Sequence, residues 1–145
     1  MFVLWQHKDC HKGKQNFFPG MAMFRGYRDL KVYQVASKLA RETFNLSRSF
    51  VEDERYSLTS QIRRSSRSVA ANIAEGFRKR QYPNMFLSKL ADSDAEAAET
   101  QVWLDFAHGC GYLSQEHQQQ LVSRYEELGK MIGSMMENPE RFMPW

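Results

Sequence analysis

The sequence predicts an all-α protein, an antiparallel up-down-up-down bundle of four helices. Apolar residues recur at three- and four-residue intervals in four segments of roughly 20 to 26 residues, which is the spacing of a helix with one buried face. Short connections between these segments favour antiparallel neighbours. No segment alternates apolar and polar residues as a strand does. The 145 residues are enough for one domain with a single core.

The first two helices are expected over residues 28–48 and 57–75. The core face of the first holds Val32, Ala36, Leu39, Thr43 and Leu46, widened by Tyr33, Ala40 and Phe44. The core face of the second holds Leu58, Ile62, Ser65, Val69, Asn72, Ile73 and Gly76. Gly76 also suits a left-handed position just past the end of this helix.

The third helix is expected from Pro83, which a first helical turn tolerates, to about His108. Its predicted inner face is Leu87, Leu90, Ala91, Ala98 and Val102. Ser114 is placed to cap the fourth helix, which ends before Asn138 and Pro139. The predicted seam of the fourth helix is Leu121, Tyr125, Leu128, Ile132 and Met135.

The helical bundle is expected to fill residues 25–138. Residues 1–24 have no periodic apolar face, so they are predicted to be a loosely ordered N-terminal extension. Residues 139–145 are predicted to be a C-terminal tail.

Charge is segregated along the chain, although the formal net charge is only +3. Residues 55–89 carry eight cations and one carboxylate, whereas residues 90–109 carry five carboxylates and no cation. Polarity between helices is therefore more informative than the overall pI, which alone does not establish affinity for nucleic acid.

Six cations are candidates for binding nucleic-acid phosphates. Arg63, Arg64 and Arg67 lie opposite the core face of the second helix, and Arg78, Lys79 and Arg80 follow in the connection. A solvated helix face explains them equally well. A third interpretation is that the acidic stripe Asp92, Glu96 and Glu99 of a neighbouring subunit receives the arginines, which would make the protein a protein-protein scaffold.

Small residues on the outer side of the second helix predict a homo-oligomer, because Ala70, Ala71 and Ala74 allow close helix packing. The predicted interface is completed by Asp92, Glu96, Glu99 and Trp103. Asn72, Glu75 and Gln101 are predicted to form an interhelical hydrogen-bond network that fixes helix register, because buried polar groups need partners.

No enzyme class is indicated. The chain has no phosphate-binding loop, dinucleotide fingerprint or catalytic triad context. A metal site is not expected, because Asp105 and His108 are the single pair with the spacing of a di-iron bundle, and His7, Cys10 and His11 make a poor zinc site. We therefore expect no cofactor and no small-molecule substrate. Two cysteines without a framework, and no long apolar run, favour a cytoplasmic location away from membranes.

Three stretches carry a family resemblance: RRSSRSVAANIAEGFRKR, with DLKVYQVASKLA before it and EAAETQVWLDFAHGCGYL after it. They resemble a bacterial four-helix-bundle family found in intervening sequences of 23S rRNA genes and often given a ribosomal-protein name. Accessory proteins of diversity-generating retroelements look like relatives. The resemblance covers about residues 27–136 and departs at the pair Ser65 and Ser66, where many members carry alanines. It implies ring-like pentamers, RNA or DNA binding in some relatives, and no enzymatic activity.

Overall fold

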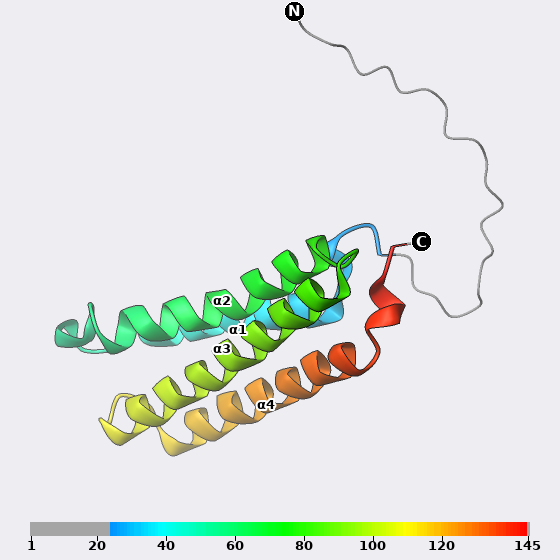
Figure 1. Cartoon of the computed structure of the whole chain (residues 1–145). Coiled ribbons are helices and arrows are strands. Elements are labelled where there is room, and N and C mark those ends of the chain that lie inside the picture. The colour runs from blue at the N-terminus through cyan, green and yellow to red at the C-terminus, as the bar shows by residue number, and fades with distance from the viewer. Residues whose placement is uncertain (1–23, 145) are drawn as a thin grey trace, which may run out of the picture.

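The computed structural model describes residues 24–144, and in this range the chain forms four long helices and no strand (Figure 1). The helices are α1 (Lys31–Ser47), α2 (Leu58–Arg78), α3 (Pro83–Gly109) and α4 (Gln115–Glu137). Short 3₁₀ helices are η1 (Tyr27–Asp29), η2 (Glu52–Glu54) and η3 (Pro139–Phe142). The all-helical prediction is confirmed. Apart from Phe24, the predicted N-terminal extension lies outside the described residues.

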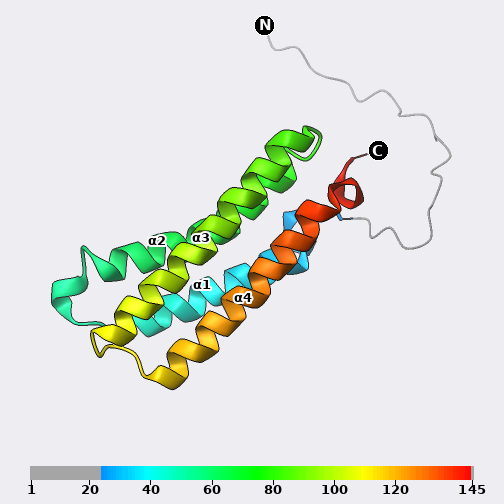
Figure 2. The same cartoon turned by 60° about the horizontal axis from the view of Figure 1, so that its bottom comes forward.

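Two interhelical ion pairs set the direction of α2 against α3. Arg64, in the first third of α2, pairs with Glu99 in the second half of α3, whereas Glu75 near the end of α2 pairs with Lys89 near the start of α3. These two helices therefore run in opposite directions, and they lie side by side along their length (Figures 1 and 2). Contact between α1 and α4 is much less extensive.

The core faces of three helices agree closely with the sequence prediction. All five residues of the predicted α4 seam are buried, as are most of those predicted for α1 and α2. These helices have charged residues opposite their apolar stripe, so the periodic signal is unambiguous. Ser114 caps α4 as predicted, because its hydroxyl accepts a hydrogen bond from the backbone N–H of His117 at 3.2 Å.

The predicted inner face of α3 is largely wrong. Leu90 is buried, but Leu87 is half-buried and the other three residues are exposed. The buried face consists of Phe86, Leu90, Ser93, Ala97, Thr100, Leu104 and Ala107. Two hydroxyl residues, Ser93 and Thr100, lie on the inner face, and several apolar residues lie on the outer face, so apolar spacing alone does not identify the buried side of this helix.

Gly76 lies inside α2 and does not terminate it, because the helix continues to Arg78. It faces α3. A Cβ at this position would lie 3.1 Å from the Cβ of Lys89 and 3.6 Å from the carbonyl oxygen of Phe86. The missing side chain therefore allows α2 and α3 to approach closely. Among residues 24–144, the glycine with a left-handed backbone is instead Gly111, with φ of 80°.

The predicted polar network of Asn72, Glu75 and Gln101 is not formed. Asn72 donates only to Ser68 of its own helix, Glu75 forms a partly exposed ion pair with Lys89, and Gln101 makes no side-chain hydrogen bond to a described residue. The buried links between helices are made by hydroxyl groups. They are Thr100 to Ser65 at 2.8 Å, Ser93 to the Val69 carbonyl at 2.8 Å, and Thr43 with Tyr125 at 3.0 Å.

The segment after α4 folds back onto the bundle, although the sequence suggested a tail. The ring of Phe142 in η3 stacks on Phe24 at 5.6 Å and packs against Phe86 at 6.0 Å. Both chain ends of the described part therefore meet at the end of the bundle where α2 turns into α3 (Figures 1 and 2). Across residues 24–144, none of the helices combines the length and apolar character that crossing a bilayer requires.

Candidate nucleic-acid interface

Two predicted cations of α2 lie over one aromatic ring of α1. The guanidinium carbon of Arg63 lies 4.5 Å from the ring centroid of Phe44, and that of Arg67 lies 5.4 Å from it. Arg63 is fixed further because its Nε donates a 2.7 Å hydrogen bond to the hydroxyl of buried Ser47. Phe44 itself is half-buried between the two helices.

Two more arginines flank Phe44 along α1. Arg41 and Arg48 stand one helical turn before and after Phe44, and residues at these spacings are neighbours on a helix surface. Both are exposed. We call Arg41, Arg48, Arg63 and Arg67 the arginine cluster. Within the part of the chain that the structure describes, none of the four has a carboxylate oxygen within 4.0 Å.

The outer side of α1 continues the cationic surface. Lys31 and Lys38 are exposed and fall in the same sector of the helix as the two arginines of α1. The single carboxylate of α1, Glu42, is bound by both terminal nitrogens of Arg124 from α4. Sequence reasoning missed this row, although its seven-residue repeats, Lys31 to Lys38 and Arg41 to Arg48, are visible in the sequence.

Arg64 belongs to the opposite flank of α2 and is already paired. Its guanidinium binds Glu99 at 2.5 Å and Glu96 at 3.3 Å, both on α3 of the same chain. The hydrogen bond from Arg64 holds the pKa of Glu99 below its usual value, against the opposing effect of burial, and Trp103 donates a further bond to the same carboxylate at 3.2 Å. Two members of the predicted acidic stripe therefore share one arginine of the same chain, while Asp92 stays exposed.

The other three predicted cations lie far from the arginine cluster. Arg78 is the last residue of α2, and the rise of an α-helix puts it roughly 16 Å along the axis from Arg67. The guanidinium carbon of Arg80 lies 3.9 Å from the ring centroid of Phe77. Arg80 also donates a 2.9 Å hydrogen bond to the Phe77 carbonyl, which gives this carbonyl in the last turn of α2 a partner. The structure thus divides the six predicted phosphate contacts into three separate places.

The predicted oligomer interface is also divided. Ala70 is buried in the core of its own chain, so it is not part of an outer surface. Ala71 is exposed and Ala74 is half-buried, and both lie on the outer side of α2.

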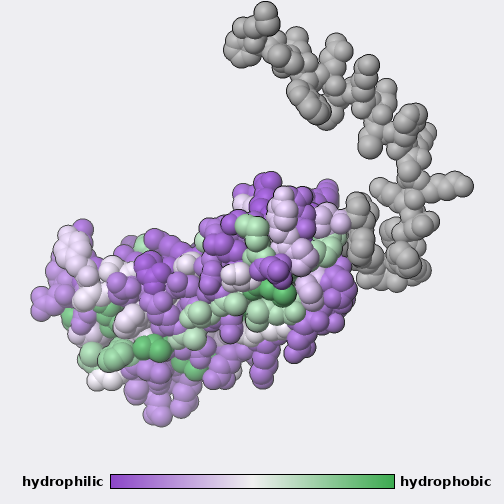
Figure 3. Space-filling model, viewed as in Figure 1, coloured by the Kyte–Doolittle hydropathy of each residue, from purple (hydrophilic) through white to green (hydrophobic). Residues whose placement is uncertain are grey.

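A second apolar surface lies on the outer side of α3. We call this surface the α3 stripe, and its exposed members are Ala91, Ala95, Ala98, Val102 and Phe106. Val102 is 45% exposed and Phe106 is 56% exposed. Figure 3 shows apolar residues, in green, following the course of α3 across this face of the molecule.

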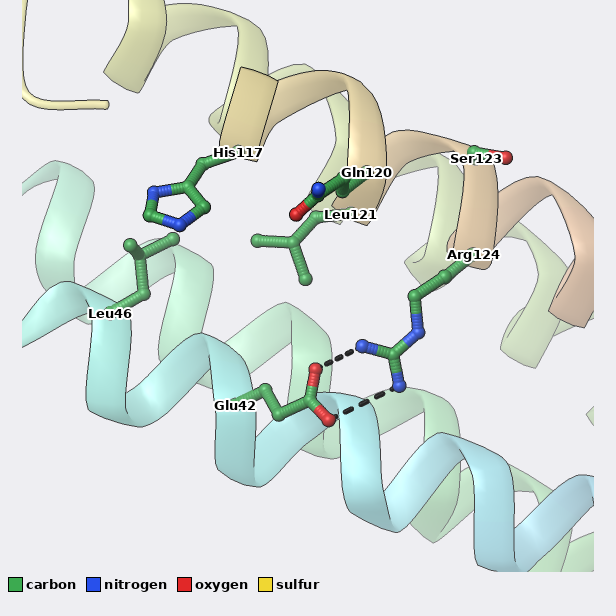
Figure 4. A pocket seen from close by; sticks show the side chains of 7 residues that line it. All are labelled: Glu42, Leu46, His117, Gln120, Leu121, Ser123 and Arg124. Carbon is green, nitrogen blue, oxygen red and sulfur yellow. Dashed lines mark hydrogen bonds and ion pairs between the residues drawn. The ribbon is translucent and has the colours of Figure 1, made fainter. Parts of the chain in front are cut away.

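A shallow groove of about 510 Å³ lies between α1 and α4 (Figure 4). Leu46 and Leu121 form its apolar floor, the Glu42–Arg124 pair closes one end, and His117 stands at the other. Both charged groups of this pair are satisfied by each other, which leaves no free charge to select a ligand. In residues 24–144 no three potential metal ligands gather, and His7, Cys10 and His11 lie outside the described residues.

Comparisons with known proteins agree with the fold. A family model described as 23S rRNA-intervening sequence protein matches residues 28–134. A crystal structure from Bacteroides thetaiotaomicron, described as a protein of unknown function from the S23 ribosomal protein family, is similar with a TM-score of 0.67 and 28% identity. That match covers 74% of this chain and 99% of the other. No curated protein matches, so the likeness to retroelement accessory proteins stays a prediction.

Proposed function

The chain belongs to the 23S rRNA-intervening sequence protein family, and from this premise we propose that it is a non-enzymatic, homo-oligomeric antiparallel bundle that binds structured RNA or DNA. Binding takes place mainly through backbone phosphates, and the protein acts as an accessory or scaffold protein in the cytoplasm. The assembly is a ring-like pentamer, as the family resemblance implies.

The arginine cluster is the observation that carries this proposal. Four guanidinium groups on two neighbouring helices have no carboxylate within 4.0 Å in residues 24–144. Guanidinium groups match phosphate oxygens with a planar fork of donors, and contacts to phosphate position a protein without reading sequence. Lys31 and Lys38 lengthen the surface along α1, as an extended polyanion requires.

Sequence-specific recognition has no support in this surface. Specific contacts to duplex DNA use side chains that reach base edges in a groove, and RNA-binding modules often stack bases on exposed aromatic rings. The aromatic ring of the cluster, Phe44, is half-buried and already covered by two guanidinium groups. We therefore expect similar affinities for different sequences of the same secondary structure.

Self-association is supported by the α3 stripe. It combines small side chains, which let another helix approach closely, with two large exposed apolar groups that gain from leaving water. Asp92 lies on one flank and Asp94 and Asp105 on the other, so a partner surface with cations at its edges fits best. The outer side of α2, where Ala71 and Ala74 lie beside Arg78, has this character.

A pure protein-protein scaffold is the alternative function, in which the arginines serve subunit pairing. The intrachain bonds of Glu96 and Glu99 to Arg64 weigh against it, because those carboxylates are then less available to a neighbour. Asp92 and the exposed arginines keep this alternative testable.

The test is a salt titration of binding by the full chain to one sequence as duplex RNA, duplex DNA and single strand. Removing two cluster cations with Arg41→Ala and Arg67→Ala should reduce the slope of log affinity against log salt by about 2 on B-DNA, because each phosphate contact contributes about 0.9. The matched control is Lys130→Ala with Arg141→Ala, which removes two exposed cations elsewhere.

The control variant should keep a slope close to that of the wild type. Equal slopes in the cluster variant and the control would refute the assignment of phosphate contacts to the cluster. Absence of wild-type binding to all three ligands at low salt would refute the nucleic-acid function itself and favour the scaffold.

A further inference from the structure

We propose that Phe44 is the positioning residue of this interface, and that its ring holds Arg63 and Arg67 as a clamp for a single backbone phosphate. This inference rests on the proposed function and adds to it a defined subsite with an uncharged residue at its centre. Phe44 touches no ligand in this proposal. It acts through the two guanidinium groups that lie over it.

The ring of Phe44 lies close to both arginines. Their guanidinium carbons lie 4.5 and 5.4 Å from the same ring centroid, so one aromatic ring contacts both charges. Attraction between a guanidinium and the ring quadrupole favours this arrangement. Residues 63 and 67 are one helical turn apart, so their side chains leave α2 in the same direction.

Arg63 is held at a second point. Its Nε donates to the hydroxyl of Ser47 at 2.7 Å, and Ser47 in turn donates to the carbonyl of Phe44 at 2.8 Å. The Nε of Arg63 is therefore occupied, whereas its two terminal nitrogens remain available as a fork. Arg67 is exposed and contributes a second fork beside it.

Such an arrangement raises affinity by reducing the entropy lost on binding. A free arginine side chain has many rotamers, and fixing it on a ligand is unfavourable, so an arginine that is already fixed binds more tightly with the same charge. Like charges also repel, and two arginines side by side need a reason to stay together. The contact that both make with the Phe44 ring, and the hydrogen bond from Arg63 to the Ser47 hydroxyl, provide that reason.

The experiment compares Phe44→Leu and Phe44→Tyr in the full chain, with the duplex ligands used above. Phe44→Leu keeps an apolar side chain but removes the ring, and we expect about tenfold weaker binding at fixed salt. The salt slope should stay near the wild-type value, because the number of cations is unchanged. Phe44→Tyr keeps the ring and should bind within about twofold of wild type.

The variant Leu46→Ala tests whether Phe44→Leu weakens binding only by destabilising the fold. Leu46 is also half-buried on α1, but it lies on the groove between α1 and α4. This variant should lose thermal stability without losing affinity. Weaker binding by Leu46→Ala to the same degree as by Phe44→Leu would overturn the positioning role, as would equal affinities of Phe44→Leu and wild type.

A measurement on the free protein keeps the inference separate from the proposed function. In the wild type, the Nε–H resonances of Arg63 and Arg67 should be displaced by the ring current of Phe44, and Phe44→Leu should return them to ordinary positions. Unshifted wild-type resonances would refute the clamp even if the protein binds nucleic acid. Shifted resonances in a protein that binds no nucleic acid would leave the ring contact intact but refute its role as a phosphate clamp.

Discussion

Replacing Tyr125 by Phe should lower the stability of the bundle in a way that depends on pH. Tyr125 is fully buried in α4, and its hydroxyl shares a 3.0 Å hydrogen bond with the hydroxyl of Thr43 in α1. Thr43 is also fully buried. Because α1 and α4 have limited contact with each other, this bond is a main polar link between them.

The expected magnitude at neutral pH follows from the partner that is left behind. In Tyr125→Phe the hydroxyl of Thr43 loses its partner inside the core, which should lower the free energy of unfolding by about 1–2 kcal/mol. Thr43→Val in the same chain removes the second polar group and keeps its shape. The double variant should therefore be more stable than the sum of the two single changes predicts.

Burial also raises the pKa of Tyr125 to about 12 from its ordinary value of 10.0, although the bond to Thr43 acts in the opposite direction. The unfolded chain therefore loses this proton at lower pH than the folded chain. The corresponding stability is fully present below pH 10 and is lost as the pH rises to about 12. A difference of two pKa units between the folded and unfolded states corresponds to about 3 kcal/mol of unfolding free energy.

The assay is urea unfolding followed by helical circular dichroism, at neutral pH and at several values between about pH 9 and 12. The difference in unfolding free energy between wild type and Tyr125→Phe should shrink as the pH rises and then change sign, because only wild type carries the buried phenol. A difference that is constant over this range would refute the argument, and additive single variants would refute the hydrogen-bond part of it.

Two further predictions concern the outer side of α3 and the ion pair beside it. Val102→Arg should lower the mass of the particle measured by light scattering, because it places a long charged side chain on the α3 stripe. The control Gln119→Arg, on the exposed side of α4, should leave this mass unchanged. Equal masses for both variants would disprove this interface. Glu99→Gln should lower stability most above about pH 4.5 and less as the pH falls, since the pKa of this carboxyl is lowered in the fold and the pair is lost on protonation. A stability difference that grows towards acid pH would contradict the assignment.

The sequence predicted the helices well where chemistry differs between their two sides. In α4, for example, Leu128 and Ile132 face inward while Glu126 and Lys130 are exposed, so one helical period decides the burial. In α3 the predicted inner face was wrong, because Ser93 and Thr100 are buried and Val102 is exposed. A small hydroxyl that can form a hydrogen bond to the neighbouring helix is as acceptable in the core as an alanine. The spacing of apolar residues in the sequence does not reveal such positions.

The types of residue at the candidate site were predictable from the sequence, but the groups that each arginine contacts were not. Arg63, Arg64 and Arg67 are equivalent in the sequence, yet Arg64 turns to carboxylates more than thirty residues further along and the other two turn to Phe44. Which flank of α2 faces α1 and which faces α3 depends on the packing of whole helices, and local patterns do not contain it. Arg41 and Arg48 could have been found, because a stripe without carboxylates on α1 is a local pattern.

The placement of α1 and α3 gives the molecule a permanent electric dipole. They occupy diagonal corners of the bundle, since each packs against α2 and α4 and the two have no substantial contact with each other. The exposed side of α1 carries Lys31, Lys38, Arg41 and Arg48, whereas the exposed side of α3 carries Asp92, Asp94 and Asp105. In the field of a polyanion, a single chain with this dipole would experience a torque that turns α1 forward before contact. Lowering the ionic strength should then raise the association rate more than a net charge of +3 alone would predict.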